Sequence, residues 1–119
     1  MKYSDRQRVQ KIHDYAVKLQ KIIAERQITR EKLMQDTGDQ WLVTTPLYNI
    51  GEHVYKLSDE FKETHDSVPW IAIENLRHRL VHDYDGTNWS MITDVVFEEL
   101  PLLIEQLERI MSRSWPAHS

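Results

Sequence analysis

The apolar residues of this chain recur three or four positions apart, and this spacing constrains the fold more than any other feature of the sequence. The clearest stripe consists of Leu47, Ile50, Val54, Leu57 and Phe61. Positions spaced in this way lie on one face of an α-helix, because the helix turns once every ~3.6 residues. No segment alternates apolar and polar residues for long enough to favour a β-strand. The spacing therefore predicts an all-α protein.

The first half of the chain is expected to form three helices. An amphipathic helix should span about 5–26, followed by a short helix within 27–36 with Thr29 as its cap, and then a long helix over about 40–63. Pro46 would lie in the first turns of the long helix, where a missing N–H is tolerated, unless the helix kinks or starts later.

The second half is expected to form two further helices. Pro69 should be the first helical residue of the fourth helix, because proline favours the first turn. Gly86 should supply the following turn, and Thr87 or Asn88 should cap the last helix. Pro101 should bend that last helix. The predicted architecture is an up-and-down bundle of four main helices and one short helix.

Length and composition narrow the class of protein. The chain has 119 residues, which fits a single domain, expected over 1–112, with a C-terminal tail over 113–119. It has no cysteine, so disulfides, thiolate nucleophiles and cysteine-based zinc sites are excluded. No apolar run is long enough for a membrane span and the N-terminus does not resemble a signal peptide, so we expect a cytoplasmic location and no membrane contact. The net charge is −4 with histidine neutral, so any contact with nucleic acid must be local.

Residues 77–84, RHRLVHDY, concentrate titratable side chains at the expected end of one helix. At ~100° per residue, Arg77 and His82 point roughly 140° apart, whereas Arg77 and Tyr84 roughly share a face. His78 and His82 are four positions apart and also share a face. The negative end of the helix dipole there favours protonated histidines.

Four interpretations of this segment are open from its residues alone. It could be a solvated helix end in which Arg79 pairs with Asp83. It could be a metal site, since Glu74, His78 and His82 follow one another at intervals of four. It could be a phosphoryl-transfer site on RNA, in which a histidine accepts a proton from a 2′-hydroxyl and an arginine stabilises the developing charge. It could also be a surface that only binds a partner.

Arg77, His82 and Tyr84 form the pattern R-x4-H-x-Y, which resembles the signature of HepT-like toxins in the HEPN ribonuclease superfamily. The position after the arginine, usually Asn, Asp or His in that family, is His78. Relatives often have glycine before the tyrosine, where this chain has Asp83. The resemblance covers about 41–110 and includes three further pairs in the family's order. These pairs are Gly51-Glu52, Pro69-Trp70 and Leu100-Pro101.

The resemblance implies a HEPN-like helical fold and a metal-independent endoribonuclease that needs no cofactor. Arg77 and His82 correspond to the catalytic pair, and His78 and Arg79 to auxiliary residues that contact RNA. Family members form homodimers in which the motifs of both copies line one composite active site. Cleavage by 2′-hydroxyl attack would leave a 2′,3′-cyclic phosphate.

The resemblance also implies a partner and a modification. The partner is an antitoxin of the MNT nucleotidyltransferase type, which in this family transfers AMP to the motif tyrosine, here Tyr84. Such AMPylation would block the cleft with bulk and negative charge. The alternative function is a non-catalytic dimeric helical module that binds RNA or the nucleotidyltransferase partner without cutting RNA.

Three residues outside the motif carry separate expectations. Gly51 interrupts the best predicted helix at a cost of ~1 kcal/mol relative to alanine, which indicates close helix packing, either at a dimer interface or within the bundle. Trp70 is expected to anchor the core at the start of its helix. Glu52 is expected on a solvated helix face rather than in the cleft.

Overall fold

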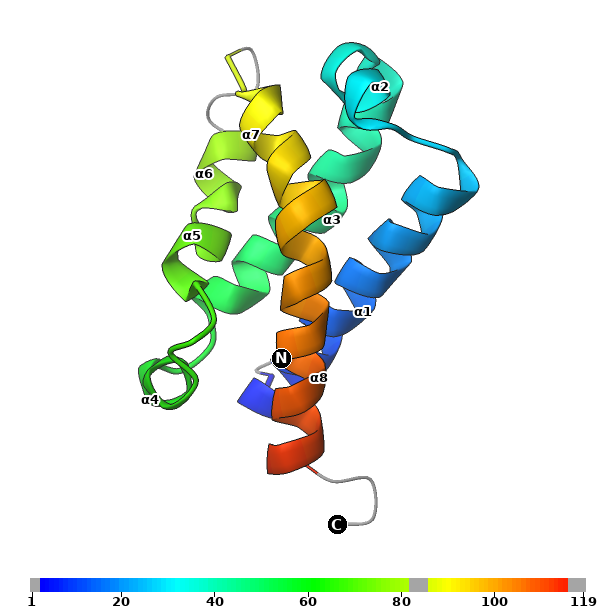
Figure 1. The fold of residues 1–119 in the computed structure, drawn as a ribbon. Helices are drawn as coiled ribbons and strands as arrows, with labels where there is room; N and C mark the ends of the chain where they lie inside the picture. Colours follow the sequence, from blue (N-terminus) through cyan, green and yellow to red (C-terminus); the bar gives the residue numbers. More distant parts are fainter. Residues whose placement is uncertain (1–2, 82–85, 116–119) are drawn as a thin grey trace.

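The computed structural model describes residues 3–81 and 86–115, and these residues form helices without any strand (Figure 1). The elements in chain order are α1 (Asp5–Glu25), α2 (Arg30–Gln35), α3 (Thr37–Tyr55), α4 (Asp59–Thr64), α5 (Trp70–Glu74), α6 (Leu76–Val81), α7 (Trp89–Asp94), the π-helical segment η1 (Val95–Glu99) and α8 (Leu100–Ser114). The all-α prediction is confirmed.

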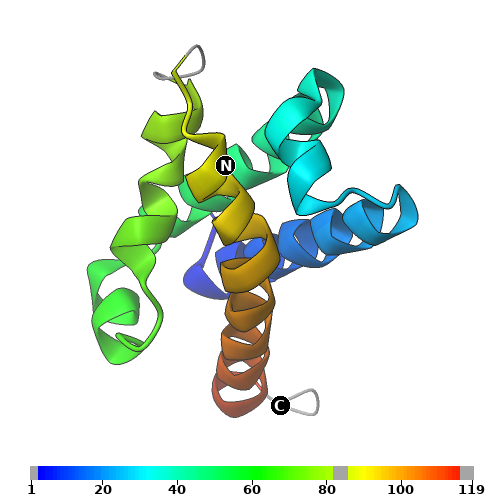
Figure 2. The ribbon, with the colours of Figure 1, turned by 45° about the horizontal axis from the view of Figure 1, so that its top comes forward.

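Four rods make the bundle: α1, α3, the pair α5–α6, and the continuous run α7–η1–α8 (Figures 1 and 2). α3 packs against α1 and also against α5–α6, and α8 packs against α1. Two short helices, α2 and α4, complete the described chain, one more than the sequence predicted. Within the described residues, no helix has both the length and the apolar character needed to cross a lipid bilayer.

The core is built from the stripes that the sequence predicted. Every member of the central stripe is buried, from Val54 at 0% exposed to Phe61 at 8%. The first helix contributes a second, equally buried stripe consisting of Val9, Ile12, Ala16, Leu19 and Ile23. Trp70 is 5% exposed, and its indole N–H donates to the His65 carbonyl at 2.9 Å. Its predicted role as a core anchor is confirmed.

The prediction of one long helix over 40–63 is wrong, because the chain breaks between α3 and α4. α3 ends at Tyr55 and Ser58 caps α4, its hydroxyl accepting a hydrogen bond from the Phe61 N–H at 3.1 Å. Asp5, from the far end of α1, accepts from both the Ser58 N–H at 2.9 Å and its hydroxyl at 2.6 Å. This contact stabilises the break. The apolar spacing continues across it because Val54, Leu57 and Phe61 are all buried in the same core.

Pro46 does not lie in the first turns of its helix, contrary to expectation. α3 begins at Thr37, where the Asp36 carboxylate caps the Asp39 N–H at 2.9 Å. Pro46 therefore lies in the helix interior, where it cannot donate to the carbonyl of Leu42. The helix continues through this position.

The remaining boundaries follow the predicted caps closely. Thr29 caps α2 through the Lys32 N–H at 3.1 Å, and Asn88, rather than Thr87, caps α7 through the Met91 N–H at 3.1 Å. Pro69 occupies the cap position of α5, one residue before the expected place. Pro101 is the second residue of α8, which follows η1 directly, so the irregularity near Pro101 takes the form of a π-helical segment.

Candidate active site

α3 and α5–α6 approach each other closely at Gly51. A Cβ atom added to this buried glycine would lie 2.9 Å from Arg77 Cγ, 3.2 Å from the Ile73 carbonyl oxygen and 3.3 Å from the Arg77 backbone nitrogen. Real Cβ atoms almost never approach other atoms below 3.0 Å. The glycine therefore serves packing within the bundle, one of the two roles that its position in the sequence suggested.

This approach brings the Arg77 side chain against the last turn of α3. Its Nε donates to the Glu74 carbonyl at 3.0 Å, and its Nη1 donates to Glu52 Oε1 at 3.1 Å. The guanidinium carbon lies 3.8 Å from the centroid of the Tyr55 ring, within range of a cation–π contact. Only 16% of the Arg77 side chain is exposed. Two bonds in its plane and a ring on its face hold the guanidinium in one orientation.

Glu52 is the acidic partner in this contact, and its expected place on a solvated face is wrong. Its side chain is 28% exposed and forms ion pairs with Arg77 at 3.1 Å and with Lys56 at 3.6 Å. Arg77 lies 25 positions later in the sequence, so no local spacing could have revealed the contact. The prediction failed because the neighbour of Glu52 is tertiary rather than local.

The other predicted site residues do not all lie with Arg77. Arg79 is exposed and lines a groove on another side of α6, and its carbonyl accepts a bond from the Thr87 hydroxyl at 3.3 Å. His78 is exposed as well. His82 and Tyr84 lie outside the described residues. Because His82 is not described, the structure does not test whether Glu74, His78 and His82 could together bind a metal ion.

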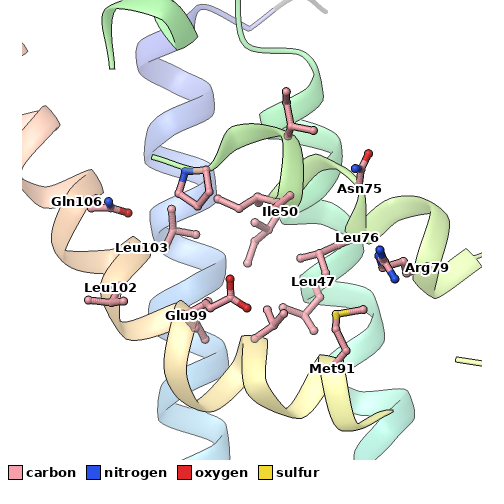
Figure 3. Close-up of a pocket in the computed structure, with 16 residues that line it drawn as sticks. Leu47, Ile50, Asn75, Leu76, Arg79, Met91, Glu99, Leu102, Leu103 and Gln106 are labelled. Atoms are coloured by element: carbon pink, nitrogen blue, oxygen red, sulfur yellow. The ribbon is translucent and has the colours of Figure 1, made fainter. Parts of the chain in front are cut away.

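The groove beside Arg79 is an open hollow of about 700 Å³ between α5–α6 and the run α7–η1–α8, with α3 at its floor (Figure 3). Its lining is mainly apolar, and Arg79 and Glu99 supply charge. Ile71 is 73% exposed and Leu102 is 59% exposed, which is high for residues of their size. One side of α5–α6 thus packs tightly on α3, while another side is open.

α1 meets α3 through a half-buried histidine, His53, that lies beside positive charge. Arg8, which is buried, donates from Nη1 to His53 Nδ1 at 3.2 Å. Burial lowers the pKa of His53, and the charges of Arg8, Lys11 and Lys56 lower this pKa further, whereas Glu52 raises it. A neutral imidazole that accepts a hydrogen bond from arginine is the form that this surrounding favours.

Comparison with known proteins connects this site with a family. Residues 7–110 match the family model described as Ribonuclease HepT-like. "Putative RNase TTE0752" of Caldanaerobacter subterraneus subsp. tengcongensis is 39% identical over 64 residues, covering 54% of this chain and 57% of that protein. "Putative RNase MJ0127" of Methanocaldococcus jannaschii is 33% identical over 84 residues, covering 71% and 69%.

A third relative and the solved structures complete the comparison. "Probable ribonuclease HepT" of Thermococcus cleftensis is 29% identical over 85 residues, covering 71% of this chain and 77% of that protein. The matched part is less than two thirds of the Caldanaerobacter protein and somewhat more than two thirds of the other two. No solved structure matches the chain.

Proposed function

This chain belongs to the HepT-like ribonuclease family, and from that premise we propose that it is a metal-independent endoribonuclease. The observation that carries the proposal is the fixed orientation of the Arg77 guanidinium. The family match spans this residue, and its guanidinium is held in one orientation beside the end of α3. An arginine held in advance is suited to stabilise charge that appears only in a transition state.

Arg77 is proposed to bind the non-bridging oxygens of the phosphate that is cut. Its Nε and one N–H of Nη1 are already committed to Glu74 and Glu52. Nothing among the described residues accepts a hydrogen bond from Nη2, and we assign this edge to the phosphate. Hydrogen bonds between a guanidinium and phosphate oxygens are short and strong because both groups are charged.

His82 is proposed to act as the general base. It would take the proton from a ribose 2′-hydroxyl, whose oxygen then attacks the adjacent phosphorus. The bond from phosphorus to the 5′-oxygen breaks, and that oxygen takes a proton from a second His82, supplied by another copy of the chain. The products are a 2′,3′-cyclic phosphate and a free 5′-hydroxyl, and no metal or cofactor enters the balance.

A homodimer with a composite active site is part of the proposal. On one helix, Arg77 and His82 would point roughly 140° apart, so they converge poorly on one phosphate. Two copies related by a two-fold axis would place residues of both chains along one cleft. His78 and Arg79, which are exposed here, would add RNA contacts and local positive charge in a protein of net charge −4.

The proposed partner is an MNT-type nucleotidyltransferase antitoxin that transfers AMP to Tyr84. Family membership supports this pairing. Seven positions separate Arg77 from Tyr84, so on a continuing helix the two would share a face. An AMP group on that tyrosine would then compete with RNA phosphate for the same guanidinium, which explains how the modification would silence cleavage.

The test is cleavage of a mixed RNA pool by purified protein in excess chelator, with the variants His82→Ala and Arg77→Ala. We expect cyclic-phosphate ends from the natural sequence and a loss of at least ~100-fold in rate from either variant. His13→Ala serves as the matched control, because His13 contacts Glu108 at 2.9 Å instead. Absence of cleavage by the natural sequence, with Tyr84 shown by mass spectrometry to be unmodified, would favour the non-catalytic binding module.

A further inference from the structure

We propose that Glu52, together with Tyr55, is a positioning residue that fixes the direction in which Arg77 offers its Nη2 group to the substrate. This inference rests on the proposed function, because it assigns a role within the same site. It concerns two residues of α3 that do not belong to the R-x4-H-x-Y motif.

Three separate contacts determine the orientation of the Arg77 guanidinium. The Glu74 carbonyl accepts from Nε, and the Glu52 carboxylate accepts from Nη1. The Tyr55 ring lies against one face at 3.8 Å. A planar group held by two bonds in its plane and a ring on one face cannot rotate without losing one of them, so Nη2 has a fixed direction.

The backbone around Gly51 makes this arrangement possible. With no Cβ at this position, Arg77 Cγ packs directly on α3, which brings the guanidinium within reach of the next residue, Glu52. Tyr55 follows one helical turn after Gly51 and is 52% exposed. The Tyr55 ring therefore packs against one face of the guanidinium and is also exposed to solvent, from which RNA could approach.

The charges leave Arg77 able to attract an anion. The Glu52 carboxylate is shared between two cations, since its Oε1 contacts Arg77 at 3.1 Å and its Oε2 lies 3.6 Å from Lys56 Nζ. One negative and two positive groups leave this cluster with a net charge of +1. A carboxylate bound to Arg77 alone would cancel its charge, whereas the shared one orients the guanidinium and leaves the cluster attractive to phosphate.

Two variants separate position from charge. Glu52→Gln keeps the length of the side chain and an oxygen that accepts from Nη1, but loses the charge. Glu52→Asp keeps the charge but is one methylene shorter, so it withdraws the oxygen from Nη1. If Glu52 acts by position, the glutamine variant should resemble the natural sequence and the aspartate variant should not.

The experiment measures RNA cleavage by these variants and the mobility of the Arg77 Nε–H group by ¹⁵N NMR relaxation. We expect kcat to fall by about tenfold or more in Glu52→Asp, with KM changed by less than about threefold, and kcat to stay within about threefold in Glu52→Gln. The Arg77 Nε–H should become mobile in Glu52→Asp and stay rigid in Glu52→Gln. Glu105→Gln is the control for loss of a carboxylate elsewhere, because it removes one from an exposed pair with Arg109 within α8.

The two readouts distinguish failure of this inference from failure of the proposed function. A rigid Arg77 with unchanged kcat in Glu52→Asp would overturn the positioning role, as would a larger loss in Glu52→Gln than in Glu52→Asp. If the natural sequence cuts no RNA but Arg77 becomes mobile only in Glu52→Asp, the contact with Glu52 is supported and the ribonuclease proposal fails.

Discussion

The rod formed by α5 and α6 has two sides that differ sharply in packing. Toward α3 it packs so closely that a single methyl group at Gly51 would approach Arg77 Cγ to 2.9 Å. Toward α7–η1–α8 it borders a hollow of about 700 Å³, with Ile71 and Leu102 largely exposed at its edges.

The difference shows that one side of this rod orients a charged side chain and the other leaves space. Close approach of two helices removes the freedom of side chains between them, since packed interiors have almost no space into which to relax. The Arg77 guanidinium is held on the close side, whereas Arg79 lies at the open groove. Adding atoms to each side in turn tests this contrast directly.

The largest effect is expected from adding one methyl group on the close side, in Gly51→Ala. Overpacking costs about 1–3 kcal/mol, and the better helix propensity of alanine returns ~1 kcal/mol, so we expect a net loss of up to about 2 kcal/mol in the free energy of unfolding. Urea denaturation measures this loss. RNA cleavage should also fall, because Arg77 is displaced.

Gly38→Ala is the control for that substitution. A Cβ at Gly38 would meet only the Asp36 side-chain oxygen, at 3.2 Å, in the first turn of the same helix. We expect it to be neutral or slightly stabilising. If Gly51→Ala proved as well tolerated as Gly38→Ala, the close side would not be closely packed in solution.

A smaller effect is expected where α1 packs against α3, at His53. The pKa of His53 is lowered from 6.5 by burial and then by Arg8, Lys11 and Lys56. The unfolded chain therefore binds this proton more readily, so the stability should be intact above pH 6.5 and should fall as the pH decreases through the lowered pKa. Denaturation at a series of pH values, with His53→Gln for comparison, measures this dependence.

The assignment of that pH dependence to His53 has a clear contrary outcome. His53→Gln should remove the part of the decrease that begins just below pH 6.5 and leave the part due to carboxylates at lower pH. Identical pH profiles for both proteins would show that His53 is not the group that titrates. The packing of α1 on α3 at His53 would then not depend on the protonation of this histidine.

The smallest effect is expected from adding atoms on the open side, in Ala72→Leu. Ala72 lines the hollow and is exposed, so the larger side chain has space, and we expect the free energy of unfolding to change by less than about 0.5 kcal/mol. Urea denaturation of Ala72→Leu and Gly51→Ala side by side compares their free energies of unfolding. A loss as large as that of Gly51→Ala would mean that the groove closes in solution.

Much of the fold could be predicted from the sequence because it depends on local rules. Thr29 and Asn88 cap their helices through bonds to residues three positions away, and such caps are readable from a short segment. The break between α3 and α4 could not be predicted in this way. Ser58 is a good cap, but its N–H and hydroxyl are held by Asp5, 53 positions earlier.

The candidate site likewise combines features that the sequence predicted with contacts that only the tertiary structure shows. The sequence pattern selected Arg77, and family membership supports that choice. It did not reveal the contacts of Arg77 with Glu52 and Tyr55, nor that Arg79 would lie at a different side of the same rod. The roles of His82 and Tyr84 stay predictions, since both lie outside the described residues.

The sequence by itself determined that the chain is all-α, which faces of its helices are buried and where several helices begin, because helical periodicity and capping act over a few residues. Only the tertiary structure decided that α3 stops at Tyr55, that Gly51 admits Arg77, and that Glu52 shares its carboxylate between two cations. These features depend on which residues meet across the bundle, and such meetings are set by the packing of whole helices rather than by local spacing.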